Sequence, residues 1–120
     1  MLKPYQDLII WQKSMELSED IYNVTRTFPS EETLGIISQL RKATISVTYN
    51  IAEGHSRNSK KEFFEFLNIS STRITELETL VMMSRRLSYL SAKNEIFILK
   101  KINDIGKILT SLKSSLAKEI

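Results

Sequence analysis

The chain has 120 residues, of which 42% are hydrophobic and 26% charged, and its formal net charge is +3. This length supports a single core, and the composition is typical of a globular protein rather than a disordered one. The absence of cysteine excludes disulfides and thiolate metal sites. We find neither a secretory leader nor an apolar run of about 18 residues. We therefore expect one cytoplasmic domain over residues 1–120 with no membrane contact.

Helix-starting and helix-ending residues predict four long helices. The first runs from about Asp7, an N-cap residue, to about Thr27, just before Phe28-Pro29. Ser30 is the predicted N-cap of the second. Gly54 ends it, because glycine readily adopts a left-handed C-cap.

The third helix follows the capping-box pattern Ser59-Lys60-Lys61-Glu62 and reaches about Tyr89. Ser91 caps the fourth, which continues almost to Ile120. Short connections of this kind join antiparallel neighbours. The predicted fold class is therefore all-α, an antiparallel up-down-up-down four-helix bundle.

Apolar residues recur at intervals of three and four in three of these helices, which is the spacing of a bundle core. In the second helix they are Leu40, Thr44, Val47 and Ile51. In the third helix the positions are Phe63, Leu67, Ser70, Ile74, Leu77 and Val81. In the fourth helix they are Ile98, Ile102, Ile105, Leu109, Leu112 and Leu116.

The first helix differs because it carries apolar residues on two opposite faces, at about 100° per residue. One face holds Leu8, Trp11, Met15 and Tyr22. The opposite face holds Ile10, Leu17, Ile21, Val24 and, at its end, Phe28. One face can meet the other helices, and the second would then be exposed to water, which a monomer avoids. We interpret the face that ends at Phe28 as a subunit interface and expect a homo-oligomeric ring or barrel.

Residues that support catalysis or metal binding are sparse. His55 is the only histidine, so neither a serine triad nor a metal site built from several histidines can be assembled. The three glycines are too scattered for a phosphate loop. Glu53, Glu76 and Glu78 have arginines nearby in the helices and are interpreted as ion-paired. We expect no enzymatic activity, no catalytic residue, no metal and no cofactor.

A small basic cluster suits phosphate groups better. Arg57, Lys60 and Lys61 lie around the start of the third helix, where backbone N–H groups also point outward. The alternative is an ordinary solvated loop. The lysines of the fourth helix are typical of the outer face of any soluble helix.

The least ordinary surface lies on the second helix, where polar residues flank the core stripe. A set of segments along the chain forms a recognisable pattern together with this polar block. They are Leu8-Ile9-Ile10-Trp11-Gln12-Lys13, Phe28-Pro29, Gln39-Leu40-Arg41-Lys42-Ala43, Ser46, Asn50-Ile51-Ala52-Glu53-Gly54, Arg57, Phe66-Leu67-Asn68-Ile69 and Glu76-Leu77. The pattern resembles the four-helix-bundle proteins encoded in 23S ribosomal RNA intervening sequences, and the resemblance spans about Tyr5 to Leu112.

The resemblance implies a homopentameric barrel of antiparallel bundles. These proteins are similar in fold to the accessory variability determinant of diversity-generating retroelements, which implies a basic surface for nucleic acid and a reverse transcriptase as partner. Most intervening-sequence members have no established activity. This chain departs from the pattern at Lys42, where arginine is usual and its guanidinium fork is lost. It also has Thr72-Arg73 where a small Gly-Ser pair is expected, which puts close helix approach there in doubt.

Two hypotheses follow. In the first, a non-enzymatic oligomeric accessory protein binds RNA or DNA, and its phosphate contacts are Arg41, Lys42, Arg57, Lys60 and Lys61. In the second, a structural or protein-interaction ring binds no nucleic acid, and its polar network consists of Gln39, Asn50, Glu53 and Glu76. The first predicts retention on nucleic acid that weakens steeply with salt.

Overall fold

The computed structural model describes residues 4–120, and residues 1–3 of the predicted domain lie outside this range. Within it the chain forms four long helices and no strand. They are α1 (Ile9–Thr25), α2 (Ile36–Ser56), α3 (Lys60–Arg86) and α4 (Ala92–Ala117), with short 3-10 helices at Tyr5–Asp7 and Ser30–Glu32. The prediction of an all-helical chain with four long helices is confirmed.

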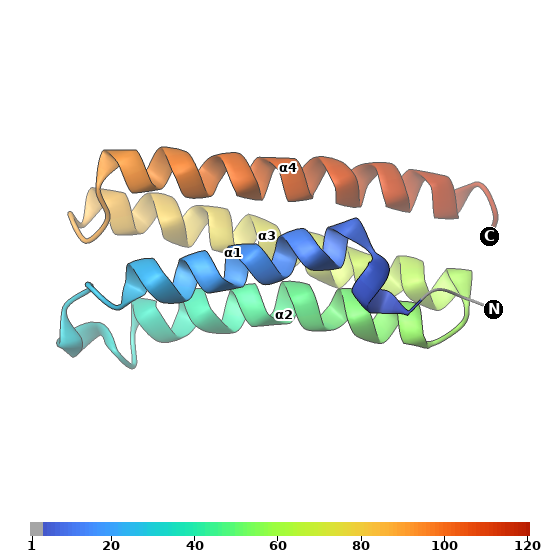
Figure 1. Ribbon diagram of the computed structural model, residues 1–120, viewed down its shortest axis with the longest axis horizontal. Helices are drawn as coiled ribbons and strands as arrows, with labels where there is room; N and C mark the ends of the chain where they lie inside the picture. The colour runs from blue at the N-terminus through green and yellow to red at the C-terminus, as the bar shows by residue number, and fades with distance from the viewer. Residues whose placement is uncertain (1–3) are drawn as a thin grey trace.

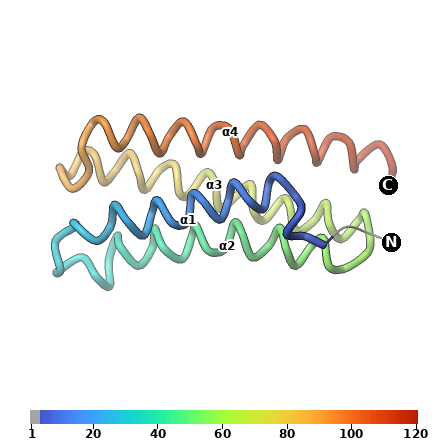
Figure 2. Tube along the Cα trace, in the orientation of Figure 1, coloured from blue at the N-terminus to red at the C-terminus, as the bar shows by residue number. Residues whose placement is uncertain are grey.

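The four helices lie side by side along the long axis of the molecule, and each runs back beside the one before it (Figure 1). α2 packs on α1 and α3, and α4 packs on α3 and α1, so every helix has two neighbours. The tube view places the start of α1 and the end of α4 at the same end of the molecule (Figure 2). One continuous core can therefore fill the space between all four helices.

The first two helices begin later than the sequence indicated. Ser30 starts a 3-10 helix, and α2 begins only at Ile36. There the Ile36 N–H lies 3.4 Å from Oε2 of Glu32, so a glutamate carboxylate replaces the expected serine cap. Likewise α1 starts at Ile9, because a 3-10 turn precedes it.

The predicted end of α2 at Gly54 is wrong. The helix continues to Ser56, and the left-handed residue after it is Asn58, with φ of 58°. A Cβ built on Gly54 would lie 2.5 Å from the Cβ of Phe66 in α3. The glycine is therefore required by the close approach of two helices rather than by a positive φ.

The serine caps of the last two helices are confirmed. Ser59 Oγ accepts a hydrogen bond from the Glu62 N–H at 3.2 Å. Ser91 Oγ accepts one from the Asn94 N–H at 3.1 Å. α3 ends at Arg86, a turn earlier than predicted.

The predicted core stripes of α2, α3 and α4 are confirmed. Their apolar members are buried, except that Phe63 and Leu112 are only partly buried. The polar members are satisfied; for example, Ser70 Oγ donates to the Val47 carbonyl at 3.0 Å. The same hydrogen bond joins α3 to α2.

The predicted subunit interface on α1 is wrong, because that face is needed inside the chain. Ile10, Leu17, Ile21 and Phe28 are at most 6% exposed within the single chain, and Val24 is partly buried against the same core. The opposite face is the outward one, although Leu8 and Trp11 also pack against the core. It holds half-buried Leu8, Trp11 and Tyr22 and exposed Met15.

In the described part of the chain no helix is both long and apolar enough to cross a bilayer.

Candidate nucleic-acid interface

The contact between α2 and α3 is made close by small residues. Gly54 admits Phe66, and the Ser70 hydroxyl reaches the α2 backbone. Thr72 is exposed, with its hydroxyl bonded to the Asn68 carbonyl, so the departure at Thr72-Arg73 does not separate the helices. Side chains that flank this contact consequently meet across a groove.

Part of that groove is a cavity of about 360 Å³, which we call the α2/α3 cavity. It is lined by Gln39, Lys42, Ala43, Ser46, Arg73 and Glu76. Three predicted site residues, from two helices, thus share one cavity. Arg73 was not among the predicted phosphate ligands, although its position one turn before Glu76 already placed it on the same side of α3.

Arg73 and Glu76 interact only loosely. Nη1 of Arg73 lies 3.6 Å from Oε2 of Glu76, beyond hydrogen-bond distance. Their side chains are 41% and 45% exposed. Both groups are therefore available to a ligand in the cavity.

The remaining polar residues of α2 continue the same stripe toward its C-terminal end. Asn50 Nδ2 donates to the Ser46 carbonyl at 2.8 Å and lies 3.0 Å from the Ser46 hydroxyl. Nη2 of Arg57 lies 2.9 Å from Oε1 of Glu53, and its guanidinium is 5.2 Å from the centre of the Phe66 ring. The predicted polar network is thus a row of local pairs rather than one connected cluster.

The basic cluster at the start of α3 is partly neutralised. Nζ of Lys60 lies 2.7 Å from Oε2 of Glu119 at the end of α4, and Arg57 is paired with Glu53. Lys61 is exposed. Because both ion pairs are well exposed, each contributes little to stability, and phosphate oxygens can compete for the cations.

Arg41 lies away from these residues, on the side of α2 that faces α1. Its Nε donates to the Thr25 hydroxyl at 3.0 Å, and Nη2 donates to the Tyr22 carbonyl at 3.4 Å. The guanidinium also lies 4.4 Å from the centre of the Tyr22 ring. These contacts occupy Arg41 in holding α1 against α2.

His55 falls in the last turn of α2 rather than in a loop. Its ring meets Phe63 edge-on, with centroids 5.5 Å apart. This packing gives the lone histidine a structural neighbour in α3.

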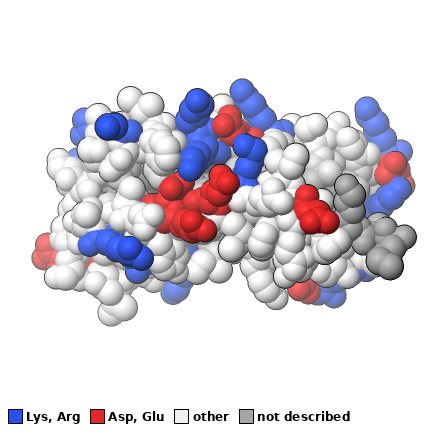
Figure 3. Space-filling view, viewed as in Figure 1, with Lys and Arg blue, Asp and Glu red and all other residues white. Residues whose placement is uncertain are grey.

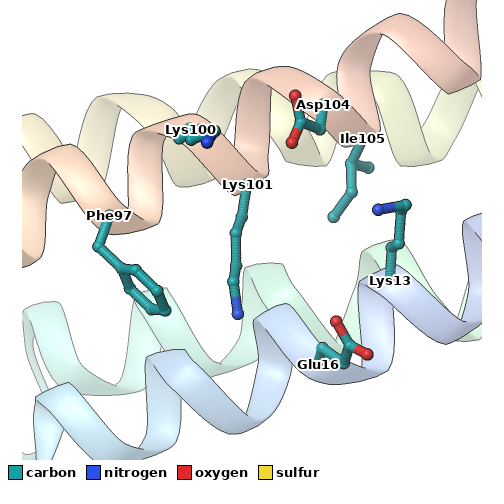
Figure 4. Close-up of a pocket in the computed structure, with 7 residues that line it drawn as sticks. All are labelled: Lys13, Glu16, Phe97, Lys100, Lys101, Asp104 and Ile105. Carbon is teal, nitrogen blue, oxygen red and sulfur yellow. The ribbon is translucent and has the colours of Figure 1, made fainter.

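A second cavity, of about 260 Å³, lies between α1 and α4. Its lining residues are Lys13, Glu16, Phe97, Lys100, Lys101, Asp104 and Ile105 (Figure 4). Lys101 is paired with Asp20 and lies 4.5 Å from the Phe97 ring centre. On this face of the molecule acidic side chains gather over α1, beside the basic ones over α4 (Figure 3). Lys101 is held by Asp20, whereas Arg73 and Glu76 lie beyond hydrogen-bond distance of each other, so the cations of the α2/α3 side are more available to phosphate.

The four long helices and the polar stripe of α2 define an all-helical protein whose distinctive face lies between α2 and α3. The family model of the 23S rRNA-intervening sequence protein matches residues 6–111. The chain belongs to this family, which confirms the resemblance found in the sequence.

A crystal structure with the same fold comes from Bacteroides thetaiotaomicron, a protein with unknown function from the S23 ribosomal protein family. It superposes with a TM-score of 0.81 at 24% sequence identity, and the match covers 88% of this chain and 98% of that chain. At this identity the likeness concerns the fold. The comparison with curated proteins finds no significant match.

Proposed function

We propose that the chain is one antiparallel up-down-up-down bundle of a homo-oligomeric ring, and that this ring binds RNA or DNA without catalysing a reaction. The observation that supports this most is the placement of Lys42, Arg57 and Arg73 along one groove. Lys42 and Arg73 line the α2/α3 cavity, and Arg57 lies further along the groove against Phe66.

The row of cations has a length suited to a nucleic-acid backbone. From Lys42 to Arg57 the helix rises roughly 22 Å, at about 1.5 Å per residue. A row of this length can follow several consecutive phosphates of one strand. Electrostatic affinity grows with the number of phosphates neutralised, and a ring would repeat the row in every subunit.

The subunit contact in this proposal uses the outward face of α1. Met15 is 39% exposed, and on the neighbouring helix Ile45 is 49% exposed. Apolar groups of this size on a small protein favour burial against a partner.

Equilibrium sedimentation tests the assembly. Met15→Glu should lower the assembled mass, whereas Asn23→Glu, at an exposed position on the same helix, should not. A wild-type protein that sediments as one compact subunit at every concentration contradicts the ring.

Fluorescence anisotropy with a labelled single-stranded RNA tests the binding. Lys42→Ala with Arg73→Ala should raise Kd about tenfold or more and reduce the slope of log K against log salt by about 1.4. The matched control is Lys93→Ala with Lys107→Ala, two exposed α4 lysines, which removes the same charge elsewhere. Equal effects of the two double variants contradict this placement of the site.

A second candidate is a structural or protein-interaction ring that binds no nucleic acid. The partners already held by Arg41, Arg57 and Lys60 favour it. In that case the wild-type protein shows no salt-sensitive RNA binding, and the same anisotropy experiment decides between the two.

A further inference from the structure

We infer that the α2/α3 cavity receives one unpaired guanine base, with Glu76 recognising its Watson–Crick edge. This inference rests on the proposed nucleic-acid binding and adds the kind of nucleobase that the cavity binds.

The lining of the cavity does not suit a phosphate alone. A phosphate offers only hydrogen-bond acceptors, and the Glu76 carboxylate would repel it. Yet the same cavity holds the Lys42 ammonium and the Arg73 guanidinium, which only donate, and the Gln39 amide and the Ser46 hydroxyl, which donate and accept. A ligand that satisfies this lining must itself present donors beside acceptors, as the edge of a nucleobase does.

The size of the cavity points to a single base. Its volume of about 360 Å³ is at the lower end of the roughly 300–1,000 Å³ typical of small-molecule sites. One base fits such a space, whereas a base pair with its two backbones does not. Double-stranded nucleic acid could then contact the cations of the groove but not fill the cavity.

Guanine matches the arrangement of charges best. Its Watson–Crick edge carries two adjacent donors, N1–H and the 2-amino group, which pair with the two oxygens of one carboxylate. The neighbouring O6 accepts from Lys42 or Gln39. Because Glu76 lies 3.6 Å from Arg73, its oxygens are not committed to that partner. The same edge is occupied in a duplex, so the base must be unpaired.

Exposed apolar side chains lie one turn from the cavity residues. Tyr49 of α2 is 61% exposed and follows Ser46 by one turn. Ile69 of α3 is 41% exposed and precedes Arg73 by one turn. They offer surfaces on which a neighbouring base can stack.

The test compares two fluorescently labelled oligouridine RNAs that carry either one central guanosine or one central inosine. Inosine lacks only the 2-amino group. Wild-type protein should bind the guanosine RNA about tenfold more tightly, the discrimination expected of a lost bidentate contact. Glu76→Gln should remove this preference. Glu78→Gln, on the same helix but lining the α3/α4 groove instead, should keep it. Thermal melting by circular dichroism checks that all proteins are folded.

Equal binding of the two RNAs by wild-type protein overturns the inference, and so does a preference that survives in Glu76→Gln. If salt-sensitive binding is nevertheless seen, the proposed function stands and only the guanine cavity is lost. If neither RNA binds at low salt, both proposals fall together.

Discussion

Gly54 of α2 lies against Phe66 of α3 so closely that a Cβ on the glycine would fall 2.5 Å from the Phe66 Cβ and 3.1 Å from the Phe63 ring. The Phe66 contact cannot be relieved by moving only the end of a flexible side chain, because this Cβ is fixed to the α3 backbone. The spacing of these helices, and with it the α2/α3 cavity, depends on a missing methyl group.

Gly54→Ala should therefore destabilise the protein by about 1–3 kcal/mol through overpacking. Gly106 provides the matched control, since a Cβ there would meet nothing within 4 Å. Gly106→Ala, in the interior of α4, should stabilise by up to about 1 kcal/mol through helix propensity. Urea denaturation of both variants measures the difference. Similar stabilities would show that the helices do not pack as described.

Arg41→Lys should cost about 1 kcal/mol of unfolding free energy, because lysine cannot reproduce the guanidinium contacts to Thr25 and Tyr22. RNA affinity should not change, since these contacts lie on the α1 side. Denaturation and anisotropy on the same preparation separate the two effects. A variant of unchanged stability with weakened RNA binding would instead support the sequence-based prediction that Arg41 contacts phosphate.

The ion pair between Asp20 of α1 and Lys101 of α4 is partly buried, with side chains 22% and 31% exposed. Asp20→Asn should lower the free energy of unfolding by about 1 kcal/mol, because the pair is partly shielded from water. Fully exposed ion pairs contribute about 0.2–1 kcal/mol to stability and often nothing. The exposed comparison is Glu119→Gln, whose pair with Lys60 is 55% and 60% exposed. Chemical denaturation in low and high salt should show the larger loss for Asp20→Asn. The reverse order would contradict this ranking of the two pairs.

Tyr89 should ionise at a higher pH than an ordinary tyrosine. Partial burial raises the pKa of Tyr89 above the ordinary value of 10.0, and the nearby Glu32 and Glu31 carboxylates add to the rise. The folded state therefore holds the phenolic proton more tightly than the unfolded state. This contribution to stability is complete below pH 10 and is lost as the pH rises through the folded-state pKa.

Subtracting the ultraviolet titration curve of Tyr89→Phe from that of the wild type isolates the ionisation of Tyr89. Glu32→Gln should lower the Tyr89 pKa toward its ordinary value. A Tyr89 that titrates at or below that value in the wild type would contradict the placement of the glutamates beside it.

The sequence predicted the four helices and three core stripes because their periodicity is one-sided. It could not decide which face of α1 is internal, since apolar residues occupy both. The structure buries the aliphatic set of Ile10, Leu17 and Ile21 and leaves the amphipathic Trp11 and Tyr22 half-buried. The difference between an aliphatic face and a face with indole and phenol groups could have indicated which face is internal, because indole and phenol groups tolerate partial contact with water.

The candidate site was predictable only within a helix. The pair of Glu53 and Arg57 follows from their spacing of four residues. Lys42 and Arg73 line the same cavity only because of the axial register between α2 and α3, and sequence spacing does not specify that register. That register is fixed in part by Gly54 against Phe66 and by the bond from Ser70 to Val47.

The most direct test of the proposed interface is photochemical cross-linking of the wild-type protein to a guanosine-containing RNA that carries 4-thiouridine, with the adducts located by mass spectrometry. We expect adducts within residues 39–57 of α2 and 66–76 of α3. Adducts confined to the α4 lysines between residues 93 and 118 would contradict it.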